Sequence, residues 1–287
     1  MSIDYDDLMS RRSDDSPFSY TDTQIMLYNL GVGMGRDPLD PKELPYVFEL
    51  PALKAVPTVV TVLGAGGSGG GMLSGVKLNW HKILHGEQRI TLHRPMPPSA
   101  DCIGRSWISE VVDKGADKGA VITMANETRL ASGEPLYTSE SVIFARGDGG
   151  FGGPSQSSAV LHVIPEREPD IVHVSETRPD QALLYRLNGD RNPLHAQPEF
   201  AKMGGFPAPI LHGLCSYGIA CRAILASVVD YDVSRIKSFG ARFTSPVFPG
   251  ETIKTDIWVD GEIVSFRCRV EARGVTSFNN GRCVIST

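Results

Sequence analysis

Residues 190–195, DRNPLH, place a carboxylate and an imidazole close together in the second half of the chain. Pro193 disfavours a helical conformation at Asn192, so the segment is predicted to be a loop that can turn Asp190 and His195 toward one point. A carboxylate and an imidazole that share a water form an acid–base pair at near-neutral pH, worth roughly 100- to 10,000-fold in rate. On its own, such a segment is more often a turn capped by its Asp or Asn side chain, so its neighbours must decide.

A second element that can do chemistry is PILHGL at residues 209–214, at the expected start of an apolar helix over 214–229. A helix N-terminus presents free backbone N–H groups and the positive end of its dipole, and Gly213 lets a ligand carbonyl approach closely. This arrangement suits an oxyanion hole, whose single donors contribute roughly 3 to 4 kcal/mol. We interpret His212 as a residue that holds the loop rather than as a catalytic group.

Together, an acid–base pair and an oxyanion donor meet the needs of water addition to a C=C bond conjugated to a thioester. The hydroxyl goes to C3, the proton goes to C2, and the thioester oxygen holds the negative charge. Two His and an Asp also invite comparison with zinc sites, but the spacing D-x4-H-x16-H matches no compact metal pattern and no Cys pair supports it. We therefore predict no metal and no cofactor.

The helix before the loop occurs twice in the chain. Residues 24–31, QIMLYNLG, match residues 181–189, QALLYRLNG, at an offset of 157. Both segments have apolar residues at helical spacing and end in Gly, as an amphipathic helix with a Gly cap does. At this offset, the residues of the first copy that match Asp190, Asn192 and His195 are Gly33, Gly35 and Pro38. We therefore expect a single active site, in the second copy.

Two shorter sequence matches predict where the two copies differ in length. LHG at 84–86 matches LHG at 211–213 at an offset of 127, and RPMPP at 94–98 matches SPVFPG at 245–250 at an offset of 151. By this count, the first copy gains 30 residues before its LHG and loses 24 residues after it. The lost residues correspond to the apolar helix of the second copy, so we expect the first copy to lack its central helix.

Strand-like segments follow in each copy. Residues 253–259 alternate and lead through an Asp-Gly turn into residues 263–270, which predicts a hairpin. In the first copy, residues 108–112, 120–130 and 141–145 are predicted strands. A helix followed by antiparallel strands, twice, indicates an α+β fold with a sheet wrapped around a helix in each module. GDGGFGGPSQSS at 147–158 is the predicted linker, so we place an N-terminal module at 1–150 and a C-terminal module at 151–287.

The amino-acid composition limits the kinds of binding partner and the cellular location that we expect. The net charge of -5 gives no electrostatic reason to expect a nucleic acid. Five cysteines without a CxxC pair are typical of a reduced, intracellular chain. No apolar run approaches the roughly 18 residues of a membrane span, and the C-terminus differs from the Ser-Lys-Leu peroxisomal address. We therefore expect a cytoplasmic protein with no membrane partner.

The run DRNPLH, followed by EFAKMGGF and PILHGLCSYG, resembles the signature of MaoC-like (R)-specific 2-enoyl-CoA hydratases, the hydratase 2 family. The segments LYNLGVG, KAVPTVV, LHGEQ, VVDKG and RGDGGFGG extend the resemblance over nearly the whole chain. They are similar to the double hot-dog hydratase unit of peroxisomal multifunctional enzymes of type 2. The motifs are long and keep their order, which makes the resemblance specific.

This resemblance implies a double hot-dog fold, a homodimer, and an acyl-CoA substrate in fatty acid metabolism such as β-oxidation. The reaction would be the reversible hydration of trans-2-enoyl-CoA to (3R)-3-hydroxyacyl-CoA. The non-catalytic N-terminal module would hold the acyl chain where its helix is missing. Cys221 stands where smaller relatives often carry a Ser, which puts a water-positioning role there in doubt. The implied catalytic residues are Asp190, His195, Asn192 and Gly213, and the implied substrate or CoA contacts are His85, Gly86, Lys114 and Arg242.

Two alternatives remain open on sequence grounds. Hot-dog folds also hydrolyse acyl-CoA, so a thioesterase would release free CoA. A non-catalytic acyl-CoA binding protein would bind the thioester without turnover, although the intact DRNPLH argues against it. The sequence also leaves open which of Asp190 and His195 takes the water proton and which protonates C2.

Overall fold

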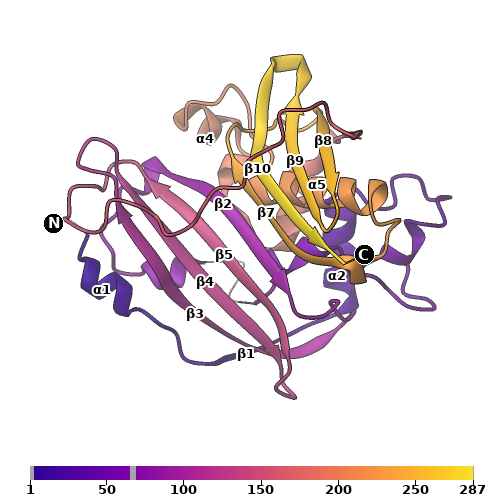
Figure 1. Cartoon of the computed structure of the whole chain (residues 1–287), viewed down its shortest axis with the longest axis horizontal. Coiled ribbons are helices and arrows are strands. Elements are labelled where there is room, and N and C mark those ends of the chain that lie inside the picture. Colours follow the sequence, from indigo (N-terminus) through magenta and orange to yellow (C-terminus); the bar gives the residue numbers. More distant parts are fainter. Residues whose placement is uncertain (1–2, 65–68, 287) are drawn as a thin grey trace.

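The computed structural model describes residues 3–64 and 69–286. One ten-stranded sheet, with every pair of neighbours antiparallel, runs through the whole molecule (Figure 1). Its order is β1-β3-β4-β5-β2-β7-β10-β9-β8-β6. The strand bounds are β1 (Ser16–Tyr20), β2 (Ile83–Leu92), β3 (Ala100–Asp113), β4 (Ala120–Leu130), β5 (Pro135–Ala145), β6 (Ile171–Glu176), β7 (Ile236–Phe243), β8 (Thr252–Asp260), β9 (Ile263–Val270) and β10 (Val275–Ile285).

The sheet consists of two halves with the same internal order. The first half is β1-β3-β4-β5-β2, and the second is β6-β8-β9-β10-β7. They join where β2 pairs with β7, from Glu87 opposite Arg242 to Thr91 opposite Ser238, and we call this pairing the seam. The predicted hairpin of the second copy is present, with Gly261 at a positive φ of 63° in the turn between β8 and β9.

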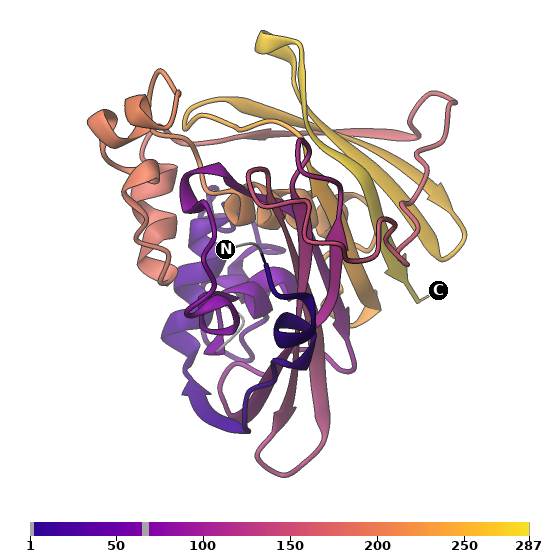
Figure 2. The same cartoon turned by 90° about the vertical axis from the view of Figure 1, so that its left-hand side faces the viewer.

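The helices lie on one side of the curved sheet (Figure 2). Ten of the fifteen residues of α5 are buried, and α5 contacts β6, β7 and β8, so the second half-sheet wraps around it as predicted. The α-helices are α1 (Tyr5–Ser10), α2 (Asp22–Gly31), α3 (Gln181–Tyr185), α4 (Pro198–Met203) and α5 (Gly213–Ser227). The 3-10 helices are η1 (Leu44–Tyr46), η2 (Pro57–Thr61), η4 (Gly69–Leu73), η5 (Trp80–Lys82), η6 (Arg186–Asn188), η7 (Pro193–His195), η8 (Val233–Arg235) and η9 (Glu271–Arg273).

The first half has a short turn in place of a long central helix. Among the described residues between α2 and β2, every helix is of the 3-10 type, and η2 packs against α2, β2, β5 and α5. Pro57 begins η2, and the β-branched residues 58–62 follow it. Such a run has low helix propensity because β-branched side chains lose χ1 freedom in a helix. The predicted loss of the central helix is therefore confirmed.

The predicted equivalence of the two LHG segments is wrong. Residues 84–86 lie inside β2, whereas residues 211–213 lead directly into α5. The strands instead keep an offset of 151, since β2 ends at Leu92 and β7 at Phe243. The first copy is thus six residues longer than the second between its helix and its first long strand, and it has not lost 24 residues. A three-residue match is too short to define the alignment of two copies.

Both halves contribute to one main hydrophobic core. Its buried residues come from α2, η2 and β2 of the first half and from α5, β7, β9 and β10 of the second. A smaller cluster lies between α1 and the strands β3, β4 and β5. In the described ranges 3–64 and 69–286, no helix is long and apolar enough to cross a membrane.

Candidate active site

The loop after α3 is built by two side chains that bind the backbone. Gly189 ends η6 with a positive φ of 118°, and Asp190 begins the loop. One carboxylate oxygen of Asp190 (Oδ1) accepts the N–H of Asn192 at 3.1 Å, and Oδ1 of Asn192 accepts the N–H of Leu194 at 3.0 Å. These turns bring His195 back over the loop, with its Nε2 atom 4.0 Å from Oδ2 of Asp190.

His195 is buried and held in one tautomer. Its Nδ1 lies 2.9 Å from the carbonyl oxygen of Ile210, so Nδ1 carries the proton and Nε2 presents a lone pair toward Asp190. Burial lowers the pKa of His195 below 6.5, against the opposing effects of the Ile210 carbonyl and the Asp190 charge, so the imidazole is neutral at neutral pH. The 4.0 Å gap is too long for a direct hydrogen bond but fits one shared water.

Three hydrogen bonds join this loop to the segment before α5. Besides the bond from His195 to Ile210, the N–H of Ile210 donates to the carbonyl of Leu194 at 3.3 Å. Nε2 of His212 donates to the carbonyl of Asp190 at 3.1 Å. The loop and the tip of α5 therefore lie side by side, as the acid–base and oxyanion interpretation requires.

Gly213 is the first residue of α5, and its N–H is not used by the helix. The first intrahelical bonds run from Cys215 and Ser216 to the carbonyl of His212, and no group among the described residues accepts the N–H of Gly213 or Leu214. A Cβ atom at Gly213 would lie 2.8 Å from Cε1 of Phe243. Glycine thus keeps the tip of α5 close to the Phe243 ring.

His85 of the first half reaches the same place from across the seam. Its ring stacks on Phe243 with centroids 4.5 Å apart, and its Nε2 lies 3.1 Å both from the Glu87 carbonyl and from Oγ of Ser141. Burial lowers the pKa of His85 to about 4, and the charge of Asp190 is among the opposing causes. Gly86 follows at an irregularity in the β2–β5 register, where a Cβ would lie 3.3 Å from the Val142 carbonyl.

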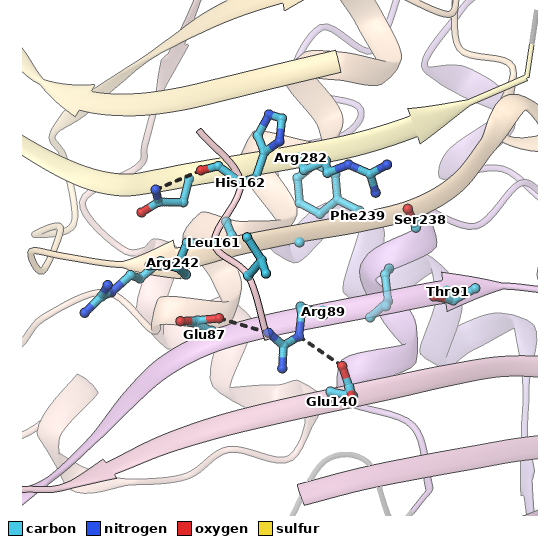
Figure 3. A pocket seen from close by; sticks show the side chains of 15 residues that line it. Glu87, Arg89, Thr91, Glu140, Leu161, His162, Ser238, Phe239, Arg242 and Arg282 are labelled. Atoms are coloured by element: carbon cyan, nitrogen blue, oxygen red, sulfur yellow. Dashed lines mark hydrogen bonds and ion pairs between the residues drawn. The ribbon is translucent and has the colours of Figure 1, made fainter. Parts of the chain in front are cut away.

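The structure does not bring Arg242 and Lys114 next to the pair. Arg242 lies beside Phe243 on β7 but lines a groove of about 270 Å³ on the outer face of the seam, with Arg89 (Figure 3). Lys114 directly follows β3, is exposed, and donates from Nζ to the carbonyl of Ser155 in the segment that links the halves, at 3.5 Å. Substrate contact at these two positions stays a prediction.

Sequence reasoning missed two aromatic side chains around the site, Tyr185 and Phe243. The rings of His195 and His212 stack with centroids 3.7 Å apart, and the ring of Tyr185 lies 5.0 Å from that of His212. Phe243 links the α5 tip to His85. Tyr185 lies just before the loop, but nothing in the sequence indicates that a ring from the end of β7 packs there. Cys221, fully buried within α5, has its pKa raised to about 12 by burial.

Asp190, His195 and His212 each offer a metal-ligating atom within 4.8 Å of the others. Carbonyl groups already occupy Nδ1 of His195 and Nε2 of His212, which leaves one free nitrogen on each ring. The two rings are stacked at an interplanar angle of 25°, so they face each other rather than converge on an ion. This geometry fits a metal poorly.

Two family models match successive parts of the chain: the MFE-2 hydratase 2 N-terminal domain over residues 18–147 and the MaoC like domain over residues 161–280. The Mycobacterium tuberculosis protein named enoyl-CoA hydratase ChsH3 is 40% identical over 91% of this chain and 91% of its own length. The Arabidopsis thaliana protein named enoyl-CoA hydratase 2, peroxisomal, is 38% identical over 94% of this chain and 91% of its own length.

Solved structures agree with these relatives. Full-length peroxisomal multifunctional enzyme type 2 from Drosophila melanogaster matches with a TM-score of 0.81 and 32% identity, covering 95% of this chain and 48% of that one. A Mycobacterium tuberculosis protein described as having a double hotdog fold matches with a TM-score of 0.55 and 13% identity over 99% of this chain and 98% of its own, which concerns the fold alone. The double hot-dog prediction is thus confirmed, and the chain belongs to the MaoC-like hydratase 2 family of enoyl-CoA hydratases.

Proposed function

We propose that this chain catalyses the reversible hydration of a trans-2-enoyl-CoA to the (3R)-3-hydroxyacyl-CoA. The observation that carries the proposal is the 4.0 Å gap between Nε2 of His195 and Oδ2 of Asp190, in a loop that hydrogen bonds to the residues leading into α5. One water fits between the two atoms, and a thioester carbonyl at the helix tip would place the conjugated C=C bond beside that water. Two relatives named enoyl-CoA hydratases support the same reaction.

The proposed chemistry uses three residues of the second half, and a fourth residue shapes the loop that carries two of them. The Asp190–His195 pair takes one proton from the water while its oxygen bonds to C3. As that bond forms, the C2=C3 electron pair shifts toward the thioester, whose oxygen takes the negative charge and is stabilised by the N–H of Gly213. The pair returns a proton to C2, so that the net change is the addition of one water. Asn192 does not touch the reacting atoms in this scheme, because its side chain shapes the turn.

The first half would supply the walls of the substrate site. We place His85 and Gly86 beside the thioester, because the His85 ring packs against Phe243 and Phe243 packs against Gly213. The exposed cations Lys114 and Arg242 would contact the phosphates of CoA. Lys114→Ala and Arg242→Ala should each raise KM about 3- to 10-fold with kcat little changed. An unchanged KM in both variants would remove these two residues from the proposal.

Product analysis tests the reaction directly. The purified chain is mixed with crotonyl-CoA or trans-2-decenoyl-CoA, and loss of the enoyl absorbance, free thiol and the configuration at C3 are measured together. We expect loss of absorbance without thiol release and a 3R product, with Asp190→Asn as the inactive control. Stoichiometric thiol release would instead identify a thioesterase, and a 3S product would contradict the stereochemistry.

We further propose that the enzyme needs no cofactor, because the addition of water is redox-neutral and the histidine geometry fits a metal poorly. Activity should survive dialysis against a chelator, and a loss restored by one metal ion would contradict this.

We also propose that the protein is a homodimer in the cytoplasm. Light scattering should give twice the chain mass of 31.1 kDa. Cell fractionation tests the location, since one relative is named peroxisomal.

A further inference from the structure

We propose that His212 is a positioning residue of this active site, whose neutral imidazole holds the main chain of Asp190 with one edge and supports the ring of His195 with one face. The inference rests on the proposed hydratase function and deepens it. It gives a task to a side chain that the acid–base scheme does not use.

The contacts of His212 all lead to the catalytic loop. The side chain is buried, with 1% of the residue exposed. Its Nε2 lies 3.1 Å from the carbonyl oxygen of Asp190, and its ring stacks on that of His195 at 3.7 Å and 25°. The Tyr185 ring packs against it at 5.0 Å. His212 is also the residue that precedes α5, so it ties the loop to the helix that carries Gly213.

The hydrogen bond determines the protonation of the ring. A carbonyl only accepts, so Nε2 must carry the proton and Nδ1 holds a lone pair. Among the described residues, Nδ1 is buried and has no hydrogen-bond partner. Burial, and then the neighbouring His195, lower the pKa of His212 to about 4, against the opposing charge of Asp190. Arg186 is the other charged group that acts on it, and it also lowers the pKa. His212 is therefore neutral at neutral pH and is not a second base.

Asp190 needs such support because its side chain is 46% exposed and lies in a loop. The Asn192 N–H holds one carboxylate oxygen, and His212 holds the main-chain carbonyl, so together they aim the free oxygen toward His195. A misplacement of about 1 Å in such a pair costs on the order of 100-fold in rate. The bond from His212 should therefore affect kcat rather than substrate affinity.

Two substitutions test the hydrogen bond of the His212 ring and its stacking on His195 separately. His212→Phe keeps a ring against His195 but removes the N–H donor, and His212→Gln keeps an N–H donor but removes the ring. The matched control is His173→Gln on β6, because His173 hydrogen bonds to Ser227 at the far end of the same helix α5, at 2.9 Å. Midpoints of thermal unfolding, kcat and KM are measured for each variant with one trans-2-enoyl-CoA.

We expect His212→Phe to lower kcat about 10- to 100-fold and His212→Gln about 3- to 10-fold, with KM within about 3-fold of the parent. His173→Gln should keep the parental kcat. A folded His212→Phe variant with kcat within 3-fold of the parent would overturn the proposal. Hydratase activity of the unaltered chain is a separate measurement, so a failure of the proposed function is recognised independently.

A double variant distinguishes positioning from general stability, even if the single variants unfold more easily. In the Asp190→Asn background the carboxylate no longer needs aiming, so adding His212→Phe should change the residual rate by less than about 3-fold. A residue that only stabilises the fold would lower the rate by the same factor in both backgrounds. That multiplicative result, measured well below the unfolding midpoint, would also overturn the proposal.

Discussion

The segments that follow the two matching helices, α2 and α3, have different functions in the two halves of the molecule. After α3, residues 190–195 present the Asp190–His195 pair. After α2, the segment at 32–43 carries no such pair but ends in Glu43, which is 2% exposed. Its carboxylate accepts hydrogen bonds from Arg222 of α5 at 3.0 Å, from the Tyr231 hydroxyl at 3.1 Å and from the N–H of Gly35 at 2.8 Å.

The comparison teaches that the two copies of a duplicated fold can take on different functions when the short segment after one helix differs between them. The half-sheets keep the same strand order, and each segment comes between the matching helix of its half and the strand at the seam. One segment carries out the proposed chemistry. The other binds Arg222 of α5, the helix that carries the proposed oxyanion donor, so the first half would assist the proposed site through this contact.

The largest effect should come from the catalytic pair. Asp190→Asn or His195→Gln should lower kcat by about 1,000- to 10,000-fold, because each removes one proton-transfer group. The fold should persist in Asp190→Asn, since that side chain is 46% exposed, and His195→Gln replaces the imidazole with a smaller polar side chain. Steady-state kinetics and thermal unfolding check both statements. The control is Asp37→Asn in the segment after α2, where the carboxylate accepts the N–H of Leu39 at 2.9 Å. A comparable loss of kcat in that control would abolish the contrast between the two segments.

The next largest effect is expected at Glu43, which we call the clamp because its carboxylate holds Arg222 of α5. Glu43→Gln removes the charge opposite Arg222, whose side chain is 16% exposed, and should lower the free energy of unfolding by about 2 to 4 kcal/mol. The neighbouring Lys42 forms an exposed ion pair with Asp230, so Lys42→Gln should change it by less than about 1 kcal/mol. Chemical denaturation measures both variants. Equal effects would show that Glu43 is not a clamp.

A smaller effect is expected at the oxyanion donor. Gly213→Ala would bring a Cβ to 2.8 Å from the Phe243 ring, so the tip of α5 must shift. We expect kcat to fall about 10- to 100-fold, less than for removal of a catalytic side chain. Gly71→Ala, where a Cβ would meet nothing within 4 Å, is the matched control. Unchanged kinetics in Gly213→Ala would remove the helix tip from the mechanism.

The mildest test is the pH profile of the unaltered chain. Burial lowers the pKa of His195 below 6.5, so the imidazole stays neutral as the pH falls to that value and becomes protonated only below it. We therefore expect kcat/KM for hydration to be flat from about pH 8 to pH 6.5 and to decline at lower pH. An acid limb centred above pH 6.5 would mean that the buried setting of His195 does not govern the reaction.

Local features of the sequence predicted much of the site. DRNPLH was interpretable because Asp, Asn and Pro form turns within a few residues, and the helix start at Gly213 followed from the apolar run after it. The lack of a central α-helix in the described part of the first half was also predicted, although the counting that led to it used a wrong match. The reason lies in the β-branched run of residues 58–62, which forms a short turn instead.

Contacts between distant segments were beyond such reasoning. Phe243 and His85 meet only because β2 pairs with β7, which no local pattern indicates. The side chain of Arg242 lies on the outer face of the seam, opposite to that of Phe243, because neighbouring residues of a strand point to opposite faces. Asp113 was likewise missed, although its carboxylate accepts the N–H groups of Gly150 and Gly152 and thereby anchors the predicted linker.

The seam has a consequence for how the enzyme behaves at low abundance. Because β2 and β7 belong to one chain, the strand pairing that sets His85 beside Phe243 forms at a constant effective concentration. A site assembled from two separate hot-dog chains would lose this wall as the chains dissociate on dilution. Here His85 and the loop at residues 190–195 stay in one molecule at any dilution of the protein. Because the two halves need not be identical, each can also accumulate its own substitutions.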